Sequence, residues 1–275
     1  MQSDGNQEAI EIRLLLEAIH AEYGYDLRDY AKTTMRRRVL AALVKSGLSH
    51  LGELQHQILG DPRLFAEVLD SLTVQVSEMF RDPSFYRAFR ERVVPILRTY
   101  PLIRIWHAGC ASGEEAYSSA ILLSEEGLYE RSHVYATDLS RQALDQAKQG
   151  IYAAEHLGSF AENHRQSGGA SEFTSYFTVA YERLAMRDSL SRNVSFFQHN
   201  LVSDDVFGEM QVIFCRNVLI YFAQNLREAV LDKFARSLCP GGFLCLGSSE
   251  QLSKAGGLRA FTAFSAEERI YRYEG

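Results

Sequence analysis

The chain contains 275 residues, of which 46% are hydrophobic and 23% are charged, a composition that excludes a disordered, collagen-like or coiled-coil chain. Its formal net charge of −6 argues against a broad nucleic-acid-binding surface, so no nucleic acid is expected as a partner. No apolar run approaches the roughly 18 residues of a membrane span, and the acidic start shows no signal peptide, so no direct membrane insertion is expected.

Residues 7–90 are predicted to be helical, because apolar side chains recur at helical spacing and no β-branched alternation appears. Gly24 ends the first helix, and the second begins near Asp29, a candidate cap, and ends at Gly47. Two shorter helices are expected at 51–59 and 63–72. The sequence therefore predicts a small helical domain, placed at residues 1–90.

After about residue 100, short apolar strands alternate with helices. The predicted strands are 102–108, 133–137, 194–198, 211–215 and 243–247, and the predicted helices are 114–126, 140–148 and 226–238. Such alternation indicates a parallel sheet in an α/β domain. An antiparallel hairpin is expected at 261–273. Residues 151–193 fit the alternation poorly, and 176–181 can pair with 183–187 as an inserted hairpin.

The cysteines predict no metal site. Their positions lack CxxC spacing, and three of the four lie inside apolar segments: Cys110, Cys215, Cys239 and Cys245. Such positions are typical of reduced thiols in a hydrophobic core. A reducing cytoplasm is the expected location.

The segments at the ends of the first two strands suggest a class of ligand, because ligands of doubly wound sheets lie beyond the carboxyl ends of the strands. Gly109 and Gly113 let the backbone come close to a ligand, but Glu114 and Glu115 follow and would repel a pyrophosphate. Asp138 ends the second strand, where a carboxylate can accept hydrogen bonds from both ribose hydroxyls. The pattern favours a nucleoside without phosphates, such as S-adenosylmethionine with its cationic sulfonium. The alternative is that the glutamates only cap a helix.

Two further strand ends carry polar residues. Asn200 and Leu201 follow the third strand and are suited to read and sandwich an adenine, although Asn at a strand end is often a simple turn residue. Arg216 and Asn217 follow the fourth strand and interrupt an apolar stretch. Arg216 is expected to face the site, the alternative being a buried partner in an ion pair.

Six segments resemble, in order and spacing, the CheR family of chemotaxis-receptor glutamate methyltransferases. They are SLTVQVSEMFRDPSFY (71–86), IWHAGCASGEEAYS (105–118), ATDLS (136–140), HNL (199–201), IFCRNVLIYF (213–222) and PGGFLCLGSSE (240–250). The resemblance extends from about Ile10 to Tyr273. It implies an all-helical N-terminal domain that docks the receptor, then a Rossmann-like methyltransferase domain at 91–275 with a small antiparallel β insertion at about 151–193.

The resemblance also implies the residues that contact the cofactor S-adenosylmethionine and its product S-adenosylhomocysteine. They are Gln75, Ser77, Arg81, Glu115, Asp138, Asn200, Leu201, Arg216 and Asn217. The family more often has Asn and Thr in place of Gln75 and Ser77, and both replacements keep hydrogen-bonding groups. Arg81 is expected to serve catalysis by holding a carboxylate of cofactor or substrate. Tyr221 is expected to place a hydroxyl near the methyl-transfer point, unless it is a packed aromatic residue.

A basic patch on the second helix is the expected docking site, because in the family this helix binds the acidic methylation region of a receptor. Arg37 and Arg38 are assigned to docking, the alternative being an ordinary solvated face. The expected buried face comprises Leu40, Leu43 and Val44, which puts Arg38 nearly opposite Leu40. The family commonly has an Arg pair where Ala41 and Ala42 stand, so the docking footprint is thinner here.

The predicted function is methyl transfer from S-adenosylmethionine to glutamates in the cytoplasmic helical region of a membrane chemoreceptor, by a cytoplasmic monomer. The alternatives are a non-catalytic S-adenosylmethionine-binding signalling module, or methylation of a receptor in a non-chemotaxis signalling array. Some family members bind a receptor's C-terminal peptide as an added strand on the insertion. The turn at 180–183 lacks glycine, so the insertion is expected to be a poor tether, because left-handed backbone favours glycine.

Overall fold

The computed structural model describes residues 2–73, 77–206, 208–252 and 260–275, with side chains from Asn6 onward. The chain divides into two compact units. The first comprises Met1–Val74, Asn200–Asp205 and Tyr221–Val230, and the second comprises Gln75–His199, Val206–Ile220 and Leu231–Gly275. The boundary expected at residue 90 lies inside the second unit. The reason is packing, because Phe80, Phe85, Tyr86 and Phe89 are buried in the core of the second unit.

Four helices form most of the first unit. They are α1 (Gln2–Tyr23), α2 (Lys32–Lys45), α3 (Leu51–Gly60) and α4 (Pro62–Leu72). Gly24 follows α1 with a φ of +74° and ends it as predicted. The expected cap at Asp29 is wrong: α2 begins after Ala31, and the carbonyl of Asp29 accepts a hydrogen bond from Ala223 N–H instead.

The buried face of α2 also differs from the prediction. The buried residues are Met35, Val39 and Ala42, whereas Val44 is 79% exposed. Helical spacing admits both faces, and the neighbouring helices select the one that is covered. Arg38 lies on the covered side and is half-buried, while Arg37 is exposed.

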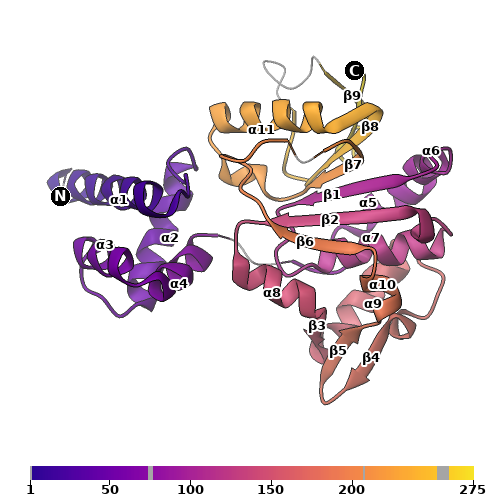
Figure 1. Cartoon of the computed structure of the whole chain (residues 1–275), viewed down its shortest axis with the longest axis horizontal. Coiled ribbons are helices and arrows are strands. Elements are labelled where there is room, and N and C mark those ends of the chain that lie inside the picture. Colours follow the sequence, from indigo (N-terminus) through magenta and orange to yellow (C-terminus); the bar gives the residue numbers. More distant parts are fainter. Residues whose placement is uncertain (1, 74–76, 207, 253–259) are drawn as a thin grey trace. The chain divides into compact units, whose positions relative to one another are not determined.

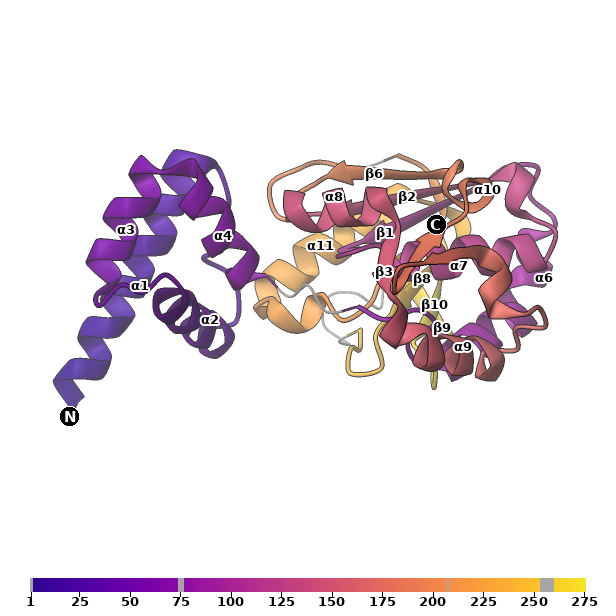
Figure 2. The same cartoon turned by 90° about the horizontal axis from the view of Figure 1, so that it is seen from below.

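The second unit contains a seven-stranded sheet in the order β6-β2-β1-β7-β8-β10-β9 (Figure 1). The strands are β1 (Ile103–Ala108), β2 (Ser132–Asp138), β6 (Val194–Gln198), β7 (Met210–Cys215), β8 (Leu238–Leu246), β9 (Phe261–Ser265) and β10 (Ile270–Tyr273). The first five in the spatial order pair in parallel, and β10 pairs antiparallel with both neighbours. The predicted α/β class and the C-terminal hairpin are confirmed. β6 lies at one edge of the sheet, as Figure 2 shows from below.

Helices precede the first of these strands and connect later ones. They are α5 (Pro83–Ala88), η1 (Phe89–Val93), α6 (Val94–Leu97), α7 (Glu114–Glu125), η2 (Tyr129–Arg131), α8 (Arg141–Gln149), η5 (Leu219–Tyr221) and α11 (Gln224–Ser237). The Ser140 hydroxyl caps α8 by accepting from Ala143 N–H at 3.1 Å. No helix of the described residues is long and apolar enough to cross a membrane.

The predicted insertion is a second, three-stranded antiparallel sheet that projects from the larger one (Figure 1). Its elements are β3 (Ile151–Ala153), η3 (Ala154–His156), α9 (Leu157–Gln166), η4 (Phe173–Tyr176), β4 (Phe177–Ala180), β5 (Arg183–Met186) and α10 (Asp188–Ser191). Tyr181 and Glu182 form the β4–β5 turn with φ of 47° and 57°. This turn therefore takes up left-handed backbone although it contains no glycine, which removes the reason given for expecting a poor tether.

Candidate active site

The glycine turn after β1 is shaped by the protein's own packing. Gly109 and Gly113 have φ of +84° and +91°, where glycine is favoured. A Cβ added to Gly109 would lie 2.5 Å from Cγ2 of Val218, and one added to Gly113 would lie 2.9 Å from Cβ of Ala147. The structure thus gives these glycines a reason that sequence reasoning missed, namely close contact with the segment after β7 at Gly109 and with helix α8 at Gly113.

Asp138 is fixed at the carboxyl end of β2. Its Oδ2 accepts a hydrogen bond from Ala111 N–H at 2.8 Å, and its Oδ1 accepts one from Ser140 N–H at 2.9 Å. These two backbone bonds fix the carboxylate at the strand end, beside the glycine turn. The position and chemistry fit a side chain that binds ribose hydroxyls.

Glu115 and Arg216 form the centre of a buried polar network. Arg216 Nη1 lies 3.0 Å from Oε2 of Glu115, and Arg216 Nη2 lies 2.7 Å from Oδ2 of Asp82. Its guanidinium also covers the Phe85 ring, 4.2 Å from the centroid. Arg216 is therefore a buried ion-pair partner at the end of β7. This is the alternative that the sequence analysis gave for this residue.

His107 orients the other oxygen of Glu115. Its Nδ1 lies 3.0 Å from Oε1 of Glu115, and its ring stacks on Phe214 with centroids 4.4 Å apart. Nε2 of His107 is buried without a hydrogen-bond partner among the described residues, and Nδ1 is the ring nitrogen that faces Glu115. Sequence reasoning missed His107 because it lies within a strand that reads as core.

The two adjacent glutamates have opposite electrostatic environments. Burial raises the pKa of Glu114, and hydrogen bonds from Ser112 and Ser77 only partly oppose this. Burial also pushes the pKa of Glu115 upward, but the hydrogen bond from His107 and the charge of Arg216 outweigh it and lower the pKa. The N-cap position of α7 is occupied by Gly113, and Glu115 is the carboxylate that its partners keep ionised.

Arg81 lies between two residues with strained backbone. Phe80 and Asp82 have φ of 53° and 58°, values that are uncommon for residues other than glycine. The Phe80 N–H donates to Ser118 Oγ at 2.9 Å, and the Arg81 carbonyl accepts from Arg216 Nη1 at 3.2 Å. The guanidinium of Arg81 makes no hydrogen bond or ion pair with the described part of the chain, so it is available for a ligand.

The remaining predicted residues fall into three groups. Ser77 donates to Glu114, and Asn217 follows Arg216 with a φ of 61°. Gln75 lies outside the described residues. The first unit contains Asn200, Leu201, Tyr221, Arg37 and Arg38.

Tyr221 packs within the first unit. Its carbonyl accepts from Ala31 N–H at 2.8 Å, and Arg38 lies over its ring, 4.8 Å from the centroid. Arg38 also donates from Nη1 to the Leu72 carbonyl at 2.7 Å. The aromatic ring of Tyr221 therefore has a structural contact, as the alternative in the sequence analysis allowed.

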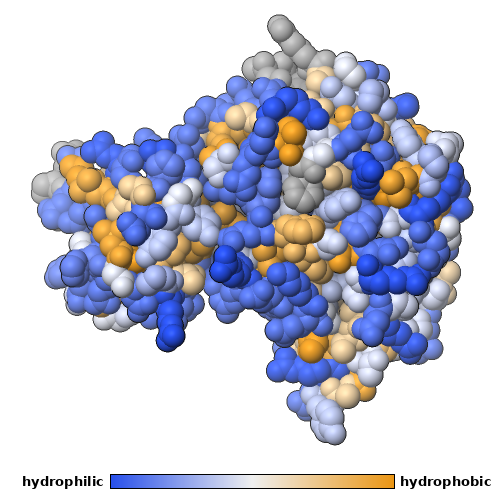
Figure 3. Space-filling view, viewed as in Figure 1, coloured by the Kyte–Doolittle hydropathy of each residue, from blue (hydrophilic) through white to orange (hydrophobic). Residues whose placement is uncertain are grey.

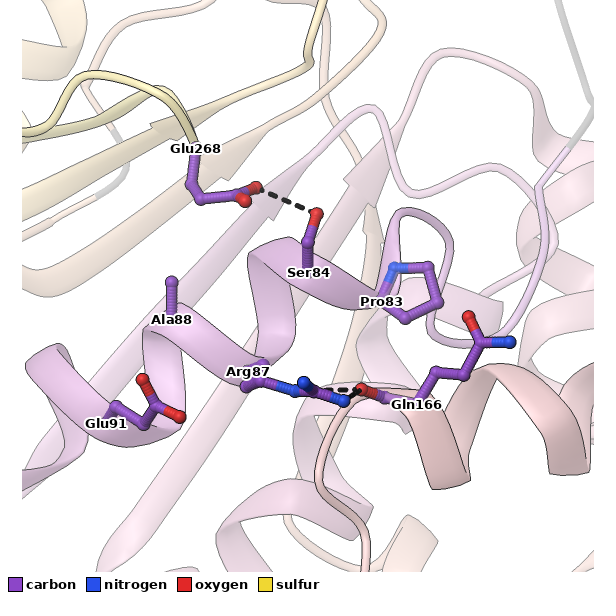
Figure 4. Close-up of a pocket in the computed structure, with 7 residues that line it drawn as sticks. All are labelled: Pro83, Ser84, Arg87, Ala88, Glu91, Gln166 and Glu268. Atoms are coloured by element: carbon purple, nitrogen blue, oxygen red, sulfur yellow. Dashed lines mark hydrogen bonds between the residues drawn. The ribbon is translucent and has the colours of Figure 1, made fainter.

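A cavity of about 600 Å³ beside α5 is a separate feature of the second unit (Figure 4). Arg87 Nε donates to the Gln166 carbonyl at 3.1 Å, and Ser84 Oγ lies 3.2 Å from Oε2 of Glu268. None of the predicted cofactor residues lines this cavity. Two pairs of its lining residues thus bond to each other, and the cavity lies apart from the predicted cofactor residues.

The parallel strand order and the carboxylate fixed at the end of β2 beside a glycine turn fit the nucleoside-binding α/β class to which S-adenosylmethionine-dependent methyltransferases belong. Comparison with known families agrees: residues 75–267 match the CheR methyltransferase, SAM binding domain, and residues 10–73 match the CheR methyltransferase, all-alpha domain. The chain belongs to the CheR methyltransferase family, and its activity is that of a protein-glutamate methyltransferase.

Curated relatives are similar along almost the whole chain. Cher3 of Pseudomonas putida, described as a candidate methyltransferase, is 47% identical over 272 residues, covering 99% of each chain. The chemotaxis protein methyltransferase of Listeria innocua is 32% identical over 236 residues, covering 85% of this chain and 87% of its own. Chemotaxis protein methyltransferase 1 of Vibrio cholerae is 32% identical over 253 residues, covering 88% and 90%.

Proposed function

We propose that this chain methylates glutamates in the cytoplasmic helical region of a membrane chemoreceptor, working as a cytoplasmic monomer. The observation that carries the proposal is the similarity to chemotaxis protein methyltransferases over more than four fifths of the chain. The polar network around Arg216 supports it, because its acidic and basic side chains suit a cofactor with charged ends and no phosphates.

The chemistry places few demands on the protein. A glutamate carboxylate has an unperturbed pKa near 4.3, so it is already the nucleophile at neutral pH and needs no general base. When bound, the cofactor supplies a methyl group activated by its sulfonium. The protein must hold the attacking oxygen in line with that methyl carbon at roughly 3 Å.

Each site residue then has a proposed task. Asp138 accepts hydrogen bonds from the ribose hydroxyls, and Glu115, kept ionised by its neighbours, attracts the cationic part of the cofactor. Arg81 holds a carboxylate of the cofactor or of the substrate with its available guanidinium. Tyr221 contributes a hydroxyl near the transferred methyl group, and Asn200 with Leu201 holds the adenine.

The helical domain is proposed to dock the receptor, and Arg37 is the exposed residue best suited to this role. Its charge is available to an acidic partner, whereas Arg38 bonds to the Leu72 carbonyl and covers the Tyr221 ring. Arg38 therefore serves docking mainly by supporting the helix that presents Arg37.

A methyl-transfer experiment with receptor-enriched membranes and labelled S-adenosylmethionine tests the proposal. We expect base-labile methyl esters on receptor glutamates, mapped by mass spectrometry, and no labelling with Arg81→Ala. Binding of S-adenosylhomocysteine without labelling of any chemoreceptor would favour the non-catalytic signalling module. Labelling confined to a receptor of a non-chemotaxis array would favour the second alternative.

A further inference from the structure

Glu250 is a buried carboxylate in the PGGFLCLGSSE segment that the mechanism does not use. It follows β8 and is 4% exposed. Its Oε2 accepts hydrogen bonds from the N–H groups of Asn217 at 2.9 Å and Gly247 at 2.6 Å, and its Oε1 accepts one from Ile220 at 3.2 Å. The N–H of Leu219 bonds to it as well. One side chain thus accepts from the backbone N–H groups of Asn217, Leu219 and Ile220, and from that of Gly247.

The loop held by Glu250 comprises residues 217–220 and follows Arg216 directly. Asn217 has a left-handed φ of 61°, which the fold must impose on a residue other than glycine. Val218 in the same loop packs against Gly109, where an added Cβ would lie 2.5 Å from Val218 Cγ2. The loop therefore touches the glycine turn as well as continuing from Arg216.

Gly247 packs closely against both the 217–220 loop and the Glu250 carboxylate. A Cβ at this position would lie 2.8 Å from Asn217 N and 2.9 Å from Oε2 of Glu250. Burial raises the pKa of Glu250, and the backbone hydrogen bonds oppose this rise. Among the described residues Glu250 forms no ion pair, and backbone N–H groups are the partners of its carboxyl oxygens.

We propose that Glu250 is a positioning residue that holds the 217–220 loop in the shape required for cofactor binding. The inference rests on the proposed cofactor role of Arg216 and Asn217. The Glu250 carboxylate accepts hydrogen bonds from the backbone of this loop. It thereby fixes the left-handed conformation of Asn217 and the position of Val218 against Gly109. A carboxylate is needed because an amide offers only one oxygen and turns two donors toward N–H groups.

Hydrogen exchange in the cofactor-free protein tests the first half of the proposal. In Glu250→Gln we expect the amides of Asn217, Leu219 and Ile220 to exchange about tenfold faster or more, which corresponds to about 1.4 kcal/mol of lost protection. Glu267→Gln, at an exposed glutamate of the β9–β10 turn, is the matched control and should leave them unchanged. Unchanged exchange in Glu250→Gln would overturn the proposal.

Calorimetry with S-adenosylhomocysteine tests the second half. We expect Glu250→Gln to bind about tenfold more weakly or worse, well below its melting temperature. Leu190→Ala, a core truncation in α10, should lower the melting temperature without this loss of affinity. An equal loss of S-adenosylhomocysteine affinity in Glu250→Gln and Leu190→Ala would indicate general destabilisation and would overturn the positioning role of Glu250.

Gly247→Ala provides an independent route if Glu250→Gln does not fold. It keeps the carboxylate but pushes on Asn217, and it should weaken S-adenosylhomocysteine binding in the same direction. Wild-type affinity in a folded Gly247→Ala protein would contradict the proposal. Arg216→Met distinguishes failure of the proposed function from failure of the positioning role. If Arg216→Met binds S-adenosylhomocysteine normally, the proposed cofactor role of Arg216 fails. If Arg216→Met binds weakly while Glu250→Gln binds normally, only the role of Glu250 is rejected.

Discussion

Arg216 and Glu115 lie 101 residues apart in the sequence and are joined by a hydrogen bond of 3.0 Å between Nη1 and Oε2. The Arg216 side chain is only 1% exposed, so the pair is screened little by solvent. Removing one partner of a buried pair leaves the other charge uncompensated, which commonly costs about 3–5 kcal/mol. Arg216 therefore links the end of β7 to the start of α7 and cannot be treated as a surface charge.

Asp138→Ala should weaken binding of S-adenosylhomocysteine by about 1–3 kcal/mol, because buried ligand hydroxyls lose their acceptor. Isothermal calorimetry measures the loss. Asp145→Ala, at an exposed aspartate of α8 that pairs with Lys148, should bind normally. Unchanged affinity in Asp138→Ala would sink the ribose assignment.

Arg81→Ala should reduce turnover more than Asp138→Ala does, with the fold intact, because the guanidinium makes no bond that the described part of the chain needs. Steady-state rates with receptor membranes measure this, and circular dichroism checks the fold. Arg87→Ala, which removes a surface bond to the Gln166 carbonyl, serves as the control. Near-normal methylation by folded Arg81→Ala would end the proposal for Arg81.

Arg37→Glu should weaken receptor methylation strongly while leaving cofactor affinity unchanged. The effect should shrink at high salt, because exposed charges are screened within about 8–10 Å at physiological ionic strength. Arg13→Glu, on the exposed side of α1, should have little effect. Equal loss in both variants would indicate that net charge, not a docking site, is responsible.

Arg38→Glu should behave differently from Arg37→Glu. It would place a carboxylate against the Leu72 carbonyl and the Tyr221 ring, so it should lower the melting temperature of the first unit. Thermal unfolding followed by circular dichroism separates the two positions. A melting temperature equal to that of Arg37→Glu would show that Arg38 is as solvated as its neighbour.

Because of Glu125, the free energy of unfolding should fall at acidic pH. Burial pushes its pKa up, but the hydrogen bond from His164 and the charge of Arg90 lower the pKa to about 2 from 4.5. A depressed pKa stabilises the folded state above pH 4.5, and this stability is lost as the pH falls toward 2. At 1.36 kcal/mol per pKa unit, the loss is at most about 3 kcal/mol, and solvent screening of the partly exposed cluster reduces it.

Glu125→Gln should therefore show a smaller fall in unfolding free energy between pH 5 and pH 3 than the wild type. Urea unfolding at several pH values measures the difference. Glu162→Gln is the control, because Glu162 also pairs with an arginine but lies exposed, where solvent screening leaves little effect. Parallel curves for Glu125→Gln and wild type would contradict the assignment.

The β insertion is expected to bind a C-terminal receptor pentapeptide weakly, since docking is proposed to rest on the helical domain. The structure removes one reason for this expectation, because Tyr181 and Glu182 adopt left-handed backbone without glycine. β4 lies at an edge of the small sheet, with Val179 53% exposed. On the projecting part of the molecule, hydrophobic residues show among hydrophilic ones (Figure 3). Titration decides: low-micromolar binding abolished by mutations in 176–187 would prove the expectation wrong.

The sequence alone predicted the order and type of most elements, because local patterns encode them. Strand β6 was predicted to the residue, and the ill-fitting stretch 151–193 marked the insertion. Boundaries that depend on distant contacts were missed. β8 begins at Leu238, the last residue of the helix predicted over 226–238, because the pairing of β7 with β8 continues across an irregularity in register.

Tertiary structure decided what each polar residue does. Asp138, Glu115 and Arg216 could be selected from the sequence because charges at strand ends are conspicuous. The sequence did not indicate that Glu115 is ionised while Glu114 is pushed toward the neutral form, because their neighbours come from segments far apart in the chain. Nor did it indicate that Glu250 supports the loop after β7. Periodicity and residue type report local preference, whereas burial and hydrogen-bond partners exist only once remote segments have packed together.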